Sequence, residues 1–95
     1  MSTPVPDKII ADINQEREHA QKYWDPDFDA CNTVNDWGTY INIYLARATK
    51  MRDKTTPFEQ YSADQRKALV KVANLAIAAL ETFDENDGFP DRHYD

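Results

Sequence analysis

The chain has 95 residues, a formal net charge of −6 and 41% hydrophobic residues, a composition that excludes an intrinsically disordered segment. A chain of this length forms one domain with a marginal core, and its acidity disfavours nucleic-acid binding through a broad basic face. The lone cysteine, Cys31, excludes an internal disulfide, and the sequence contains neither a signal peptide nor an apolar run that could span a membrane. We therefore expect a cytoplasmic protein.

The first predicted helix covers about residues 6–23. Its apolar residues recur at helical spacing and form a narrow stripe that we expect to be buried, made up of Ile9, Ile10, Ile13, Ala20 and Tyr23. Pro26 and the surrounding Asp and Asn residues then predict a loop, because proline disfavours helix at the preceding residue. Trp24 is expected to anchor this loop.

The second predicted helix covers about residues 33–51, with Asn32, Thr33 or Asn35 as its cap. Its apolar positions follow helical spacing and comprise Trp37, Ile41, Tyr44, Leu45 and Ala48. Gly38 indicates either fraying or the close approach of another backbone. A polar connection over residues 51–61 is long enough to reverse the chain direction.

The third predicted helix covers about residues 62–84, and Ser62 with Gln65 fits a capping box at its start. Its apolar surface extends almost all round and comprises Leu69, Val72, Ala73, Ala76, Leu80 and Phe83 on one face, with Val70, Leu75 and Ile77 beside it. A helix this apolar needs neighbours on several sides. Gly88 and Pro90 are expected to end it.

These elements predict a single all-α domain over residues 1–95, built from an N-terminal helix and an antiparallel helical hairpin. Because a small monomer would leave part of the third helix in water, we expect a homo-oligomer, either a dimer or a larger assembly. The tail, residues 85–95, is interpreted as frayed, as a lid over a site, or as an arm that holds another subunit.

A line of polar residues runs along the otherwise apolar surface of the third predicted helix, and it consists of Lys67, Lys71, Asn74 and Glu81. One interpretation makes it the solvent edge of the helix, where lysine stems cover apolar neighbours. The other brings it against Arg47 of the second helix and forms a cationic pocket in an acidic protein.

Such a pocket would suit an anionic, nucleotide-like small molecule. Arg47 would grip phosphate oxygens with its planar fork, Lys71 would add a point charge, and Asn74 would donate or accept. Either Tyr40 or Tyr44 would stack on a base. The predicted binding residues are therefore Arg47, Lys71, Tyr44, Asn74, Lys67 and Tyr40.

The sequence nominates no catalytic residue, metal ligand or cofactor. His19 and His93 are isolated, and the acidic segment 25–29 lacks the glycine and terminal glutamate of a calcium loop. Glu81 and Asp84 have the i, i+3 spacing that could share a magnesium ion, but ordinary solvation is the preferred interpretation because no further acid is expected beside them.

Residues 15–24, 35–41, 45–50 and 66–84 together resemble the small phage and bacterial proteins related to the all-α MazG-type nucleotide pyrophosphohydrolases. The resemblance implies magnesium-dependent hydrolysis of nucleoside triphosphates by carboxylates on the second and third helices. At the corresponding positions this chain has no carboxylate, since they are occupied by Ile43, Tyr44, Arg47, Ala68 and Lys71. Apolar and cationic side chains cannot hold Mg²⁺, so we expect no family-type hydrolysis.

Three functions remain open from the sequence. The first is a non-catalytic, phage-type accessory protein that binds or sequesters a nucleotide-like anion in the host cytoplasm. Its role would be to counter a bacterial defence system. The second is an acidic protein that inhibits a host or defence protein through a protein–protein contact. The third is a magnesium-dependent pyrophosphohydrolase with a site at Glu81 and Asp84.

Overall fold

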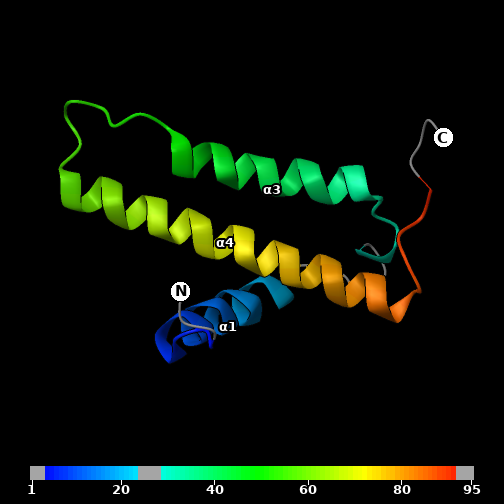
Figure 1. Ribbon diagram of the computed structural model, residues 1–95. Helices are drawn as coiled ribbons and strands as arrows, with labels where there is room; N and C mark the ends of the chain where they lie inside the picture. The colour runs from blue at the N-terminus through cyan, green and yellow to red at the C-terminus, as the bar shows by residue number, and fades with distance from the viewer. Residues whose placement is uncertain (1–3, 24–28, 92–95) are drawn as a thin grey trace.

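A computed structural model describes residues 4–23 and 29–91, which form three labelled helices and no strand. These helices are α1 (Asp7–Gln21), α3 (Val34–Thr49) and α4 (Phe58–Glu85). Figure 1 shows α3 and α4 as an antiparallel pair, with α1 lying on another side of α4. The predicted all-α hairpin with an N-terminal helix is therefore confirmed. None of these helices is long and apolar enough to cross a membrane.

The start of α3 is fixed by a reciprocal cap. Thr33 Oγ1 accepts from Asp36 N at 3.3 Å, and Asp36 Oδ2 accepts from Thr33 N at 2.9 Å. Two backbone donors that the helix itself cannot use are thereby satisfied. Thr33 was one of three predicted caps. A close backbone approach at Gly38 is not found, because a Cβ placed there meets no atom within 4 Å.

The predicted start of the third helix at Ser62 is wrong, since α4 begins at Phe58 after Pro57. The connection to α3 is therefore shorter than predicted. Instead of capping α4, the side chain of Gln65 donates from Nε2 to the carbonyl of Ala48 at 3.1 Å. This bond satisfies a carbonyl at the end of α3. The Gln65 side chain, which the local sequence pattern assigned to the cap of its own helix, therefore makes a tertiary contact instead.

The end of α4 is a Schellman turn. Asp87 adopts the left-handed conformation with φ 54°, and Gly88 N donates to the carbonyl of Phe83 at 2.8 Å. Phe89 then packs edge to face on Phe83, with ring centroids 5.1 Å apart. The described part of the tail thus returns toward α4. The last four residues of the predicted tail, 92–95, and the predicted loop anchor Trp24 lie outside the described residues.

The core lies between α3 and α4 and centres on Trp37, Leu75 and Ala79. Partly buried side chains surround it, namely Tyr40, Ile41, Tyr44, Ala78 and Phe89. By contrast, no residue of α1 is buried, so the predicted buried stripe of the first helix is wrong. The reason is that, among the described helices, α1 packs against α4 alone, which leaves Ile9 and Ile10 exposed.

Candidate functional site

The C-terminal end of α3 and the first half of α4 face each other across a pocket of about 400 Å³. Tyr44 and Arg47 are three residues apart on α3, and Lys67 and Lys71 are four apart on α4, so each pair lies on one helix face. The hairpin brings the two faces together, and Ala68 keeps the floor open because its side chain is small. We call this cavity the α3–α4 pocket. Its lining also includes Lys50, Met51, Asp53, Thr56, Tyr61, Asp64 and Gln65.

The ring of Tyr44 places two of the cations. Arg47 Cζ lies 4.9 Å from its centroid and Lys71 Nζ lies 5.5 Å from it, both within the range of a cation–π contact. Two like charges would otherwise separate. The electron-rich face of one aromatic ring offsets part of their repulsion and holds both cations at the pocket.

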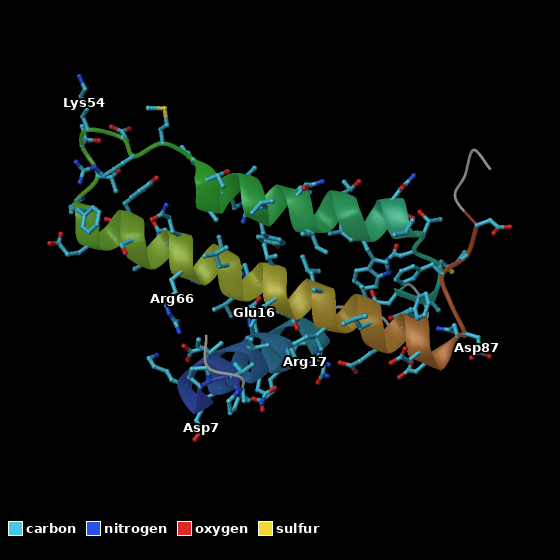
Figure 2. The ribbon with its side chains drawn as sticks, viewed as in Figure 1. Asp7, Glu16, Arg17, Lys54, Arg66 and Asp87 are labelled. Carbon is cyan, nitrogen blue, oxygen red and sulfur yellow. The ribbon has the colours of Figure 1, made fainter. Side chains whose placement is uncertain are left out.

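Helix α1 reaches the same place through a single carboxylate. Glu16 Oε1 lies 2.7 Å from Lys71 Nζ, and the two side chains are only 18% and 23% exposed. Figure 2 shows Glu16 directed from α1 toward α4. An ammonium group has three donors, so Lys71 keeps donors for a second anion while Glu16 fixes its position.

The α3–α4 pocket is locally basic within an acidic chain. Four lining residues are cationic, Arg47, Lys50, Lys67 and Lys71, against two lining acids, Asp53 and Asp64. Asp53 is committed to the loop, because its Oδ1 accepts from the N–H and the hydroxyl of Thr55 at 2.9 and 3.0 Å. The backbone and side-chain hydrogen bonds from Thr55 lower the pKa of the Asp53 carboxyl. The Asp53 carboxylate therefore stabilises the turn that contains Thr55.

Four of the six predicted binding residues line this pocket, namely Arg47, Lys71, Tyr44 and Lys67. Tyr40 does not, because one helical turn brings it against the core, where its ring meets Trp37 edge to face at 6.3 Å. Asn74 does not either. It is buried on the side toward α1, where its Oδ1 accepts from Arg17 Nη1 at 3.5 Å.

Sequence reasoning did not nominate Glu16, Lys50 or Tyr61 for this site. Lys50 and Tyr61 flank the reversal of the chain, and the Tyr61 hydroxyl donates to the carbonyl of Lys50. Their pairing depends on the true start of α4. Glu16 could have been found only by knowing that α1 docks beside Lys71, since nothing in the local pattern of α1 indicates that register.

A second pocket of about 390 Å³ lies at the junction of α1, α3 and α4. Its lining carries acids at Asp29, Glu81 and Glu85, with Arg17 as its cation. Arg17 already binds the Glu81 carboxylate. This second pocket is therefore acidic and unsuited to an anion.

The carboxylates of the described chain do not gather into a metal-binding group. Across residues 4–23 and 29–91, no cluster of three or more His, Cys, Asp or Glu side chains could hold an ion. Glu81 is directed to Arg17. Of the five positions that the family resemblance points to, four line the α3–α4 pocket, and these are Tyr44, Arg47, Ala68 and Lys71.

Comparison with known proteins assigns the chain to no family. No protein-family model, curated protein or solved structure matches it. The function therefore has to be argued from the geometry of the pocket.

Proposed function

We propose that the α3–α4 pocket binds a nucleotide-like anion and holds it without hydrolysis. One observation carries the proposal: four cations and the ring of Tyr44 line one cavity in a protein whose net charge is −6. An acidic protein repels anions over most of its surface. A local cationic cavity then concentrates them at one place and gives the pocket its selectivity for charge.

The chemistry of the lining fits phosphate groups. The guanidinium of Arg47 forms a planar fork that matches two phosphate oxygens, and Lys67 and Lys71 supply point charges. The cavity volume of about 400 Å³ lies in the range that small-molecule sites occupy. Because Tyr44 already holds two cations, its role is to position them; the ring of Tyr61 is the more available surface for a base.

Sequestration rather than turnover is supported by the type of side chain present. A magnesium-dependent pyrophosphohydrolase holds its metal through carboxylates, whereas Arg47 and Lys71 repel a cation. Both residues instead neutralise phosphate directly. A protein with such a site would remove free nucleotide from solution in proportion to its own concentration.

The test is differential scanning fluorimetry and calorimetry with mono-, di-, tri- and cyclic nucleotides, with and without Mg²⁺. We expect one nucleotide class to raise the melting temperature without Mg²⁺. Arg47→Ala and Lys71→Ala should each weaken its binding about 10-fold or more, the loss expected for a charge-assisted hydrogen bond. Lys54→Ala removes an exposed cation outside the pocket lining and serves as the matched control, with unchanged affinity.

A variant with the opposite sign sharpens the test. Glu16→Gln removes a negative charge 2.7 Å from Lys71 Nζ while retaining an oxygen that can accept from it. Anion affinity should rise several-fold, because the ligand no longer competes with a carboxylate for Lys71. Absence of binding by every nucleotide would overturn the proposal and direct attention to a protein partner of the acidic surface.

A further inference from the structure

Helix α4 has a third side that neither α1 nor α3 occupies. It is a stripe of apolar residues spaced alternately four and three apart, and it consists of Leu69, Ala73, Ala76, Leu80 and Phe83. This is the spacing of a coiled-coil seam. Leu69 is 52% exposed, Leu80 62% and Phe83 45%, while the two alanines are half-buried. We call these five residues the α4 seam.

Four residues of the α4 seam, from Leu69 to Leu80, are arranged symmetrically about one point, which we call the seam midpoint. Leu69 and Leu80 lie at equal distances on either side of the point between Asn74 and Leu75, and so do Ala73 and Ala76. We propose that a second copy of this chain packs on the α4 seam, antiparallel and related by a two-fold axis through that midpoint. Leu69 of each copy then meets Leu80 of the other, and the central alanines allow the two helices to approach closely.

Charge at the edge of the seam favours the antiparallel arrangement. Arg66 and Asp84 are 18 residues apart on α4, which is about five helical turns, so both lie on the same edge. A two-fold axis at the seam midpoint sets Arg66 of one copy beside Asp84 of the other, and does so twice. A parallel two-fold pair would instead put this edge of the two copies on opposite sides of the interface, so Arg66 of one copy could not reach Asp84 of the other.

Both charged groups are accessible for such a contact. Asp84 is exposed, and the side chain of Arg66 is about half-exposed even though it lies 2.8 Å from Asp12. A guanidinium has five N–H donors, so one bond to Asp12 leaves others for a partner. The α4 seam also lies on a different side of α4 from Lys67 and Lys71, so this dimer is independent of the anion pocket.

The first measurement is the mass in solution by analytical ultracentrifugation. The unaltered chain should sediment as a dimer. Leu80→Glu places a charge in the seam of both copies and should raise the dissociation constant at least about 100-fold, while circular dichroism shows that the helices remain. Met51→Glu, at a strongly exposed loop residue outside the seam, is the matched control and should leave the dimer unchanged. A monomeric unaltered chain overturns the proposal.

The second measurement fixes the direction of the pair. In a Cys31→Ser background, Leu69→Cys or Leu80→Cys alone should not form an intermolecular disulfide, because equivalent positions lie about 16 Å apart along antiparallel helices. A mixture of the two variants, or the double variant, should cross-link on oxidation. Efficient cross-linking of Leu69→Cys by itself would indicate a parallel pair and would overturn the antiparallel geometry.

Discussion

Helix α3 packs on α4 through buried side chains, whereas α1 packs on the same helix through charged ones. Trp37 of α3 is 3% exposed and contacts Leu75 and Ala79 of α4 in the apolar core. On the other side, α1 buries no residue and meets α4 through three ion pairs, which are Asp12–Arg66, Glu16–Lys71 and Arg17–Glu81. Figure 2 shows Glu16, Arg17 and Arg66 along this boundary.

The difference shows that α4 holds its two neighbouring helices, α3 and α1, with unequal strength. Burial of large apolar side chains is worth several kcal/mol, whereas an ion pair with a half-exposed partner, such as Arg17–Glu81 or Asp12–Arg66, contributes about 1 kcal/mol or less and is screened by salt. We therefore expect the α3–α4 hairpin to hold the fold and α1 to detach first. Such local opening is a common property of weakly packed segments.

The largest expected effect is on the hairpin. Trp37→Ala should lower the free energy of unfolding by about 3–5 kcal/mol, because it leaves a cavity in the centre of a small core. Urea denaturation followed by far-ultraviolet circular dichroism measures this loss. Met51→Ala is the exposed control and should change stability little. A loss below about 1 kcal/mol for Trp37→Ala would show that the core does not depend on the indole.

A smaller effect is expected at α1. Arg17→Ala removes the cation that binds Glu81 and the donor to the buried Asn74, so the free energy holding α1 on α4 should fall by about 1 kcal/mol. Hydrogen exchange should speed up in α1 and remain unchanged in α3. Added salt should act in the same direction in the unaltered chain. Equal acceleration in all three helices would contradict the separation of the two attachments.

The limits of sequence reasoning follow the same division. Most of the apolar face of α3 could be predicted from helical spacing, since Trp37 and Ala48 are buried, but Leu45 of the same predicted stripe is 40% exposed. Helix α4 is apolar almost all round, so periodicity could not choose which side meets α3. Leu75 took that place, while Leu69 and Leu80 from the more continuous stripe are exposed.

The part of the candidate site that the α3–α4 hairpin forms could be predicted from the sequence. A meeting of Arg47 with Lys71 is one of the two interpretations that the sequence allows, because the antiparallel helices of a hairpin face each other. Asn74 was assigned to the same line as Lys71, yet Asn74 turns to Arg17. Its placement depends on where α1 docks, and ion pairs between distant segments leave no local pattern in the sequence.

The smallest expected effect is a pH dependence confined to α1. Hydrogen bonds from Lys8 and Arg66 lower the pKa of Asp12 below its ordinary value of 3.8. A lowered pKa in the folded state means that the ionised form contributes stability above about pH 4, and that this contribution is lost as the pH falls through the folded value. As the pH falls below about 4, hydrogen exchange in α1 should therefore speed up more than exchange in α3. Asp12→Asn, which keeps the shape of the side chain without its charge, should remove this component. Should α1 and α3 respond to acid identically in both proteins, Asp12 would not be one of the groups that attach α1 to α4.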